Sequence, residues 1–590
     1  MRNNKLFKKL CCGLLTATMV MTSLTGCGNK PVDDETNVAG TTTSESTVTS
    51  ETTATEPGFA HDANLSEPGT EPVCKEKIKL TIGLAQNTNV IDYDTNALTL
   101  MLEELMNVDI EFHLFTASEI KTQIDLMVNA GGDDLPDIIL TTLDKETVYK
   151  YGQAGMFIPL NDFYENSSYY LAEAIEKVKT DDGVDAIGQL TVYDGNVYAV
   201  PGYTGSAVNP CITTTWLYTP WLEALDLEVP KTTEDFYKVL EAFKTQDPNG
   251  NGKADEIPAL GANMSSAYGN SLMFASYCID PFVRVNPNVY FLDSENGKLS
   301  VTYANEEFKE GIKYLRSLVE AGLYDSTSFT QTGDLFKTIM NQEGDQTVGC
   351  FTQVSDSFIS SSHPSRNNWT LVPPLEGPKG EVNASFTANK ADPAGFITKS
   401  CENPEAAFRL LDLMYNEVVM CSGRWGVQGE NWDFVKDLKQ ADYPDYNFEN
   451  TFAGYGATLL EYNTVWNQVQ NANWALTRPA LRTNGFSAGV SAAAMREGTT
   501  TWQQGLSLGT YYDAAPEEKL SEVSFLYADA DEAAELMETA GMLGTYVKEK
   551  IALWATGAAD IDAEWDSYLK ELENMGLSDW LAAMQAAYER

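Results

Sequence analysis

The chain has 590 residues, with 85 acidic and 39 basic side chains and a formal net charge of −46 at pH 7. This charge argues against nucleic acid and anionic membrane surfaces as partners, because both repel an acidic protein. The chain has only three histidines, His61, His113 and His363. This small number argues against a His-dependent catalytic triad and a His-rich metal centre.

The N-terminus has the pattern of a secretion signal over residues 1–26. Basic residues at positions 2–9 precede an apolar run, 10–24, which is short for a membrane-spanning helix of about 20 residues. The sequence Leu-Thr-Gly-Cys that ends at Cys27 resembles a bacterial lipobox. This resemblance implies cleavage before Cys27 and acyl chains (diacylglycerol, palmitate) that hold the protein on the extracellular face of the cytoplasmic membrane. The alternative is an ordinary secretory signal with an incidental cysteine.

The segment that follows the anchor, residues 27–73, is rich in Thr, Ser, Glu, Pro and Asn and has few large apolar side chains. Such a segment cannot bury enough surface to offset its ordering entropy. We therefore predict a disordered tether over 27–73 and a folded body over 75–590.

Six cysteines lie beyond the anchor at wide, irregular spacings that form no metal signature. An even number permits disulfides in a secreted protein, but a body of this size does not need them. We expect mostly reduced, buried thiols at Cys74, Cys211, Cys278, Cys350, Cys401 and Cys421.

The body opens with alternating strands and helices. Apolar alternation predicts strands over 78–84, 110–114 and 137–140, and apolar residues at helical spacing predict helices over 98–106 and 120–128. This βαβαβ order is typical of an α/β fold with a mostly parallel sheet covered by helices. A body of this length exceeds one core, so at least two domains are expected.

Ligands of such sheets bind beyond the carboxyl ends of the strands. Residues Gln86 to Asn89, Thr116 and Thr141 to Thr142 follow the three predicted strands, so we expect them to rim a cleft. Ser118 is the expected N-cap of the second helix.

Several segments, in order along the body, resemble extracellular solute-binding proteins of family 1, which are mostly carbohydrate receptors of ABC importers. The matching segments are GGDDLPDII at 131–139, GMFIPL at 155–160, DGNVYAVP at 194–201, WLEALDLEVPKT at 221–232, PPLEGPKG at 373–380 and the C-terminal run 565–590. The resemblance implies a two-lobed, periplasmic-binding-protein-like (type II) fold with a cleft between the lobes. It also implies a sugar or oligosaccharide ligand, delivery to ABC importer permease subunits, and no catalysis.

The resemblance further implies how the chain is divided. Lobe 1 is expected over about 75–205 with a returning segment near 345–430, and lobe 2 over about 209–340 with much of 435–590. The lobes would close on the ligand by a hinge motion. Tyr218 and Pro220 depart from the family, in which many relatives carry Arg and Asp near these positions.

Several local signals concern folding alone. Asp194 and Gly195 predict a tight hairpin between 192–193 and 197–200. A core-facing helix is predicted at Phe236 to Phe243, and Ser578 is the expected cap of the last helix.

The sharpest chemical motif follows the Phe236 helix. Oxygen ligands alternate along it and Gly252 permits the turn that brings a backbone carbonyl inward, as in the first half of an EF-hand-like Ca²⁺ loop. Pro258 stands where the bidentate Glu of the full pattern belongs. The loop is similar to one in alginate-oligosaccharide-binding relatives, which implies that two carboxylates complete the shell. The alternative is an Asn-Gly-rich turn capped by Asp247. The expected structural Ca²⁺ site comprises Asp247, Asn249, Asn251, Lys253, Asp255 and Glu256.

A sugar site needs aromatic platforms flanked by amides and carboxylates. The chain has 11 Trp and 28 Tyr, and a Gly-punctuated loop at 424–432 combines Trp with Glu. The alternative is that these Trp side chains anchor loops by packing. Candidate ligand-binding residues are Trp425, Glu430, Trp432, Tyr203, Asn209, Trp216, Trp466 and Trp474.

Two other function classes stay open at this point. A surface glycosidase or lyase also uses aromatic clefts and carboxylates, but no local signature proposes a catalytic pair. A peptide-binding transport receptor shares the anchor and the two lobes, but would favour main-chain hydrogen bonding over aromatic platforms.

Overall fold

The opening strands of the body form a parallel sheet. In this computed structural model, β1 (Ile78–Ala85) pairs in parallel with β2 (Val108–Phe115) on one side and β3 (Ile138–Leu140) on the other. The helices α1 (Ala97–Met106) and α2 (Ile120–Asn129) connect these strands, so the predicted βαβαβ order is confirmed.

The structure describes a single compact unit from Phe59 to Arg590. The described residues are 59–205, 210–356, 358–360, 363–434, 457–459, 465, 468–476, 479–484, 486 and 508–590.

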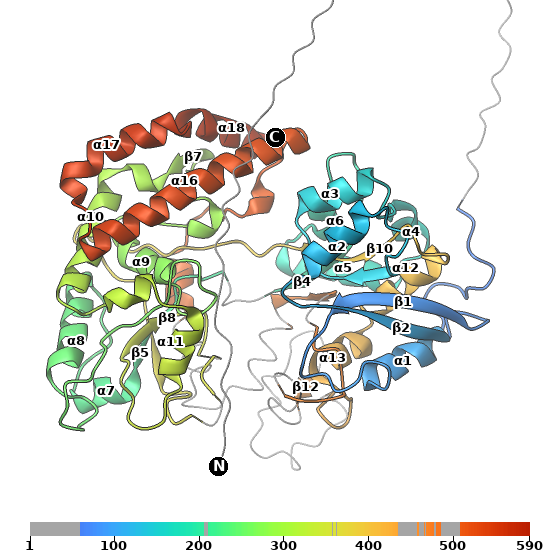
Figure 1. Ribbon diagram of the computed structural model, residues 1–590, viewed down its shortest axis with the longest axis horizontal. Helices are drawn as coiled ribbons and strands as arrows, with labels where there is room; N and C mark the ends of the chain where they lie inside the picture. Colours follow the sequence, from blue (N-terminus) through green and yellow to red (C-terminus); the bar gives the residue numbers. More distant parts are fainter. Residues whose placement is uncertain are drawn as a thin grey trace, which may run out of the picture. The chain divides into compact units, whose positions relative to one another are not determined.

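Three strands from distant parts of the chain complete the first sheet (Figure 1). β10 (Asp392–Ile397) is antiparallel to both β3 and β4 (Val200–Thr204), and β13 (Ala480–Arg482) is parallel to β4. Among the described strands the order is β13-β4-β10-β3-β1-β2. The helices that share a buried core with this sheet, besides α1 and α2, are α3 (Lys145–Gln153), α4 (Asn161–Asn166), α5 (Tyr170–Asp182), α6 (Ala186–Leu190), α12 (Pro404–Leu413) and α13 (Glu417–Trp425).

A second, antiparallel sheet has the order β8-β5-β9 and belongs to two other buried cores. Its strands are β5 (Thr215–Tyr218), β8 (Cys350–Thr352) and β9 (Trp369–Val372). Hairpin β6 (Leu292–Glu295) and β7 (Lys298–Val301) and the pair β11 (Trp432–Phe434) and β12 (Ala457–Leu459) stand apart. The helices of this part are α7 (Thr219–Ala224), α8 (Thr233–Thr245), α9 (Ser271–Ile279), α10 (Glu306–Glu320), α11 (Gly333–Met340), α16 (Ala530–Thr556), α17 (Ile561–Asn574), α18 (Leu577–Glu589) and the 3-10 turns η1 (Pro287–Val289), η2 (Thr302–Ala304), η3 (Ser326–Phe329) and η7 (Glu522–Ser524).

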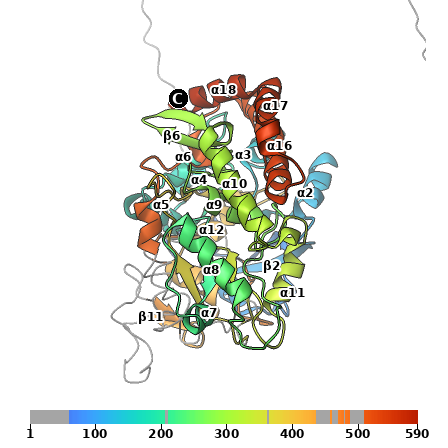
Figure 2. The same cartoon turned by 90° about the vertical axis from the view of Figure 1, so that its left-hand side faces the viewer.

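Helix α10 illustrates why these residues fold as they do (Figure 2). Asn305 caps it by accepting a hydrogen bond from the Phe308 amide. Acidic residues in its first turn interact favourably with the positive end of the helix dipole. Phe308, Ile312 and Leu315 are buried where α10 packs against α9 and α16. The predicted core helix is also confirmed: α8 is capped by Thr232 and buries Phe236.

We call the parts built on the two sheets lobe 1 and lobe 2. The chain crosses from lobe 1 to lobe 2 after β4 and returns between β9 and β10. It reaches β13 in lobe 1 and ends in lobe 2 with α16 to α18. The predicted return near residue 345 is corrected, since β8 and β9 still pair with β5 of lobe 2.

Three local predictions need correction. At Asp194 and Gly195 the chain makes a tight turn, with Gly195 at φ 80, but β4 begins only at Val200 because it pairs with β10 and β13. Helix α2 has no side-chain cap, so Ser118 does not cap it. Ser578 donates to Glu573 at 2.7 Å and lies inside α18, which starts after Gly576.

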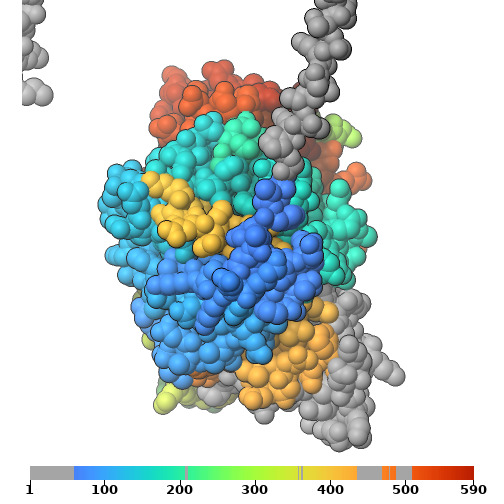
Figure 3. All heavy atoms as spheres, turned by 90° about the vertical axis from the view of Figure 1, so that its right-hand side faces the viewer, coloured from blue at the N-terminus to red at the C-terminus, as the bar shows by residue number. Residues whose placement is uncertain are grey.

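Residues 59–73, predicted to belong to a disordered tether, instead pack on lobe 1; we call them the strap (Figure 3). Leu65 is buried and forms an isolated bridge with Cys74. The guanidinium of Arg409 on α12 donates to the carbonyl oxygens of Ser66 and Glu67 at 3.1 and 3.2 Å. These contacts provide hydrogen-bond acceptors for a buried guanidinium, whose charge is also stabilised by Asp412 and Glu405.

No disulfide links the six cysteines that follow Cys27, all of which are described; five are buried and Cys401 is half-buried. No described helix is both long and apolar enough to cross a membrane.

Candidate functional site

The edge of the first sheet where β1 and β3 end leads directly to a cavity. Thr141 and Thr142, predicted to rim a cleft, follow β3, and the next residues, Leu143 to Glu146, line the cavity. Its volume is about 680 Å³, within the range of about 300–1,000 Å³ that small-molecule sites usually have.

Both lobes contribute to this cavity, which we call the tyrosine cavity. Lobe 1 supplies the start of α3, part of α6, Tyr193 and the start of β10. Lobe 2 supplies Tyr290, residues 522–523 and 525–527, and Met537. Helices α3 and α16 pack together beside it. A ligand held here would contact both lobes at once, which is what a hinge-closing receptor requires.

Three half-buried tyrosines, Tyr193, Tyr290 and Tyr527, line the cavity. The Tyr193 hydroxyl donates to Glu146 Oε1 at 3.1 Å, and Lys145 Nζ lies 5.7 Å from the centroid of the Tyr193 ring. Partly exposed rings beside hydrogen-bonding groups suit the apolar ring faces and hydroxyl rims of sugars.

Neighbouring groups and burial shift the pKa values of Asp144 and Lys145 at the cavity. Burial would raise the pKa of Asp144, but hydrogen bonds from Lys121 and Thr147 outweigh it and lower the pKa to about 2. Burial lowers the pKa of Lys145, and the charge of Glu146 opposes this shift. Asp144 is therefore ionised at neutral pH.

Four predicted ligand residues lie inside the cores, with exposed fractions of 0–1%. The indole nitrogens of Trp216, Trp432 and Trp474 donate to Gln353 O at 2.8 Å, Gly426 O at 2.9 Å and Thr99 Oγ1 at 2.7 Å. The Tyr203 hydroxyl donates to Asp182 Oδ2 at 2.8 Å. In this arrangement the four side chains pack, and a contact with ligand stays a prediction for them.

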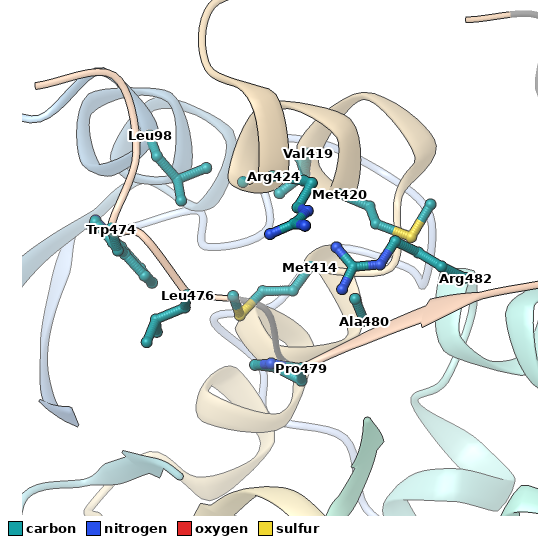
Figure 4. A pocket seen from close by; sticks show the side chains of 11 residues that line it. Leu98, Met414, Val419, Met420, Arg424, Trp474, Leu476, Pro479, Ala480 and Arg482 are labelled. Atoms are coloured by element: carbon teal, nitrogen blue, oxygen red, sulfur yellow. The ribbon is translucent and has the colours of Figure 1, made fainter. Parts of the chain in front are cut away.

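The loop at 424–432 lies beside a second, smaller cavity (Figure 4). Trp425 is 9% exposed and stacks on Phe486 with centroids 5.1 Å apart, while Glu430 is exposed. Arg424 and Trp474 line the cavity, whose volume of about 20 Å³ leaves room for about one water molecule. A sugar ring does not fit there. Predicted residues Asn209 and Trp466 lie outside the described residues.

The predicted calcium loop follows α8 as a series of side-chain-capped turns. The Asp247 carboxylate accepts from the amides of Asn251 and Gly252 at 3.1 and 3.0 Å. Asn251 Oδ1 accepts from the Lys253 amide at 2.8 Å, and Asn251 Nδ2 lies 3.2 Å from Asp255 Oδ1. Gly252, at φ 73, takes the left-handed conformation that the motif requires.

Glu256 shows why a cation fits this loop. Its Oε1 is buried and has no hydrogen-bond partner among the described residues. Burial, followed by the charges of Asp255 and Asp247, raises the pKa of Glu256. A divalent cation would satisfy the buried oxygen and offset the repulsion. Among the described residues, no three His, Cys, Asp or Glu side chains lie close enough together to bind a metal ion by themselves. Amide and carbonyl oxygens would therefore have to complete the coordination shell.

Sequence reasoning missed the three tyrosines of the cavity. Tyr193 lay in the predicted hairpin, and Tyr290 and Tyr527 carry no local signal. Only the prediction that residues after β3 face a ligand pointed to this place.

Comparisons with known proteins show the family of the chain. Residues 101–420 match the family described as bacterial extracellular solute-binding protein. The fructooligosaccharide ABC transporter substrate-binding protein FusA of Streptococcus pneumoniae is 26% identical over 499 residues, which cover 80% of this chain and 83% of FusA.

Solved structures show the same fold. The S. pneumoniae FusA EF-hand mutant in complex with fructo-nystose has a TM-score of 0.67 and 24% identity, covering 87% of this chain and 99% of that one. An HMO-binding, ABC-transporter-associated solute-binding protein from Bifidobacterium longum infantis has a TM-score of 0.70 and 20% identity, with coverage of 87% and 99%. The predicted two-lobed α/β fold is confirmed.

Proposed function

Because the chain belongs to the bacterial extracellular solute-binding proteins, we propose that it captures a sugar or oligosaccharide outside the cell and delivers it to the permease subunits of an ABC importer. The observation that carries this proposal is the tyrosine cavity, where both lobes present half-buried tyrosine rings around a volume of about 680 Å³. The ligand named for FusA, a fructooligosaccharide, supports the sugar class.

Calorimetric titration of residues 28–590 with kestose, nystose, lacto-N-tetraose and short peptides tests the proposal. A glycan that binds, raises the melting temperature and is recovered intact supports a receptor. Tyr193→Ala should lower the affinity for that glycan at least about tenfold, because it removes an aromatic ring on which a sugar can stack. Tyr268→Ala is the matched control, since Tyr268 is a partly exposed tyrosine outside the cavity.

Two other outcomes would replace this function. Cleavage of the glycan would favour the glycosidase or lyase alternative, which family membership already argues against. Binding of peptides alone would keep the transport role and overturn the sugar assignment.

The loop after α8 is proposed to hold a structural Ca²⁺. The residues that would hold it are Asp247, Asn249, Asn251, the Lys253 carbonyl, Asp255 and Glu256; the buried, unpartnered Oε1 of Glu256 supports this set. The naming of an EF-hand in a FusA structure supports calcium in a relative. Bound Ca²⁺ would cross-link the loop between α8 and the second sheet and take no part in chemistry on the ligand.

Thermal unfolding with Ca²⁺ and after chelation tests the calcium site without any sugar. Ca²⁺ should raise the melting temperature, since it binds the folded loop alone. Asp247→Asn removes a charged ligand and should abolish the rise. Asp162→Asn, in the first turn of α4, is the matched control.

The lipid anchor at Cys27, which lies outside the described residues, is part of the proposal. The basic residues, apolar run and Cys27 of the N-terminus support it. Palmitate labelling in a Gram-positive host should mark the wild type and not Cys27→Ala, and the variant should appear in the medium. A variant that is secreted no more than the wild type would contradict the anchor.

A further inference from the structure

We infer that the tyrosine cavity selects an uncharged oligosaccharide and rejects glycans that carry carboxylate groups. This inference rests on the proposed function, because it takes the cavity as the ligand site.

Carboxylates outnumber cations on the cavity wall. Among the described lining residues, the cations are Lys145 and Lys390. The carboxylates are Asp144, Glu146, Asp185, Asp392 and Glu522. A bound anion would therefore approach more like charges than opposite ones.

The cations are not positioned to receive a ligand carboxylate. Lys390 forms an ion pair with Glu522 and lies 3.4 Å from Asp392, so two carboxylates already share it. Lys145 faces the Tyr193 ring, and burial weakens its hold on the proton. In the described part of the chain, neither Glu146 nor Asp185 lies within ion-pair distance of a cation.

Carboxylates of both lobes act on the two tyrosines that lobe 2 contributes to the cavity. Burial and then the charges of Glu522 and Glu146 raise the pKa of Tyr290. The pKa of Tyr527 is also raised, first by burial and the neighbouring tyrosines and then by the charges of Glu146 and Glu522. Because Glu146 belongs to lobe 1 and Glu522 to lobe 2, the two lobes impose the same sign on the space between these rings.

Carboxylates nevertheless suit a neutral sugar. Glu146 and Asp185 accept hydrogen bonds from Tyr193 and from the Gly188 amide, and each has a further oxygen that can accept from a hydroxyl. Hydroxyl groups bring donors without charge, whereas a uronic acid brings acceptors and charge.

Matched ligands test the inference. Each neutral glycan that binds residues 28–590, among kestose, nystose and lacto-N-tetraose, is compared by calorimetry with its derivative oxidised to a carboxylate at a primary hydroxyl. Trigalacturonate is the independent acidic probe. The carboxylated form should bind at least about tenfold more weakly. Equal or tighter binding of the acid forms would overturn the inference and leave the sugar-receptor function standing. Binding of neither class would overturn the proposed function itself, and with it the inference.

Variants separate charge from shape. Asp185→Asn with Glu522→Gln removes two charges while keeping side-chain size, so the ratio of acidic to neutral association constants should rise at least about fivefold. Glu111→Gln, an exposed carboxylate on β2 paired with Lys79, is the matched control and should leave the ratio unchanged. High salt should also raise the ratio in the wild type, because it screens the carboxylates. A ratio insensitive to both would overturn the inference.

Discussion

The Glu405 carboxylate on α12 accepts a hydrogen bond from His61 Nδ1 at 2.7 Å, although 344 positions separate the two residues. The same carboxylate accepts from the Asp62 amide at 2.7 Å and from the Ser167 hydroxyl at 2.8 Å. Glu405 is 5% exposed, so the strap supplies much of the polar environment of a buried charge. The strap therefore belongs to the folded body.

Removing the strap should destabilise the body. A chain starting at Lys75 leaves Glu405 and Arg409 without their strap hydrogen-bond partners. Leaving a buried polar group without its partner costs about 1–3 kcal/mol. Urea unfolding of chains starting at Gly28, Phe59 and Lys75 checks this. The first two should unfold together and the third at lower urea. Equal midpoints for all three would show that the strap does not stabilise lobe 1.

Glu256 should destabilise the calcium-free loop. Because its pKa is raised in the fold, its ionised form is disfavoured there at neutral pH. Glu256→Gln should therefore raise the melting temperature after chelation and reduce the gain that Ca²⁺ gives. In the wild type that gain should fall as pH drops through the raised pKa, since a protonated carboxyl no longer binds the cation. Scanning fluorimetry from pH 4 to 8 measures both effects.

Trp474 should matter for stability and little for ligand affinity. It is 1% exposed and donates to the Thr99 hydroxyl, so Trp474→Ala leaves a cavity and removes this hydrogen bond, while Thr99 still donates to the Tyr93 carbonyl. The expected loss is about 3–5 kcal/mol of unfolding free energy. Trp474→Phe keeps the ring volume in part and should lose less. A folded Trp474→Phe protein with a large loss of sugar affinity would instead support the prediction that Trp474 binds ligand.

The first sheet could be predicted from sequence because its signals are local. Apolar alternation at 78–84 and 110–114 fixes which side chains face the core, whatever else the chain does. β10 and β13 could not be predicted, because their partner β4 lies far away in sequence. The sequence of a short strand does not show which distant strand it pairs with.

The candidate site was predictable only in part for the same reason. The residues after β3 follow from topology, and the calcium loop from its spacing. The meeting of Tyr193, Tyr290 and Tyr527 depends on how both lobes pack. The Trp residues attracted attention by type, but large aromatic side chains also fill cores. The sequence did not show that Trp216 and Trp474 are buried in this arrangement, and their contact with ligand stays a prediction.

Asp280 should make stability fall between about pH 4 and pH 7. Its carboxylate is buried and accepts from the Val285 amide at 2.8 Å and from the amide and hydroxyl of Ser385 at 3.0 and 2.9 Å, where the chain returns toward lobe 1. Burial raises its pKa to about 7 despite these hydrogen bonds.

The sign follows from proton linkage. Between the unfolded pKa of about 3.9 and the folded value, the native state binds more protons than the unfolded state, so the free energy of unfolding decreases as pH rises. Asp280→Asn keeps an acceptor and removes the charge. At pH 4.5, where Asp280 is protonated, the free energy of unfolding of the variant should equal or fall below that of the wild type. Between pH 4.5 and pH 8 the variant should gain up to about 3 kcal/mol relative to the wild type. Urea unfolding at both pH values measures this difference. A difference between the two proteins that stays constant with pH would show that Asp280 is ionised throughout, held by Ser385 and Val285.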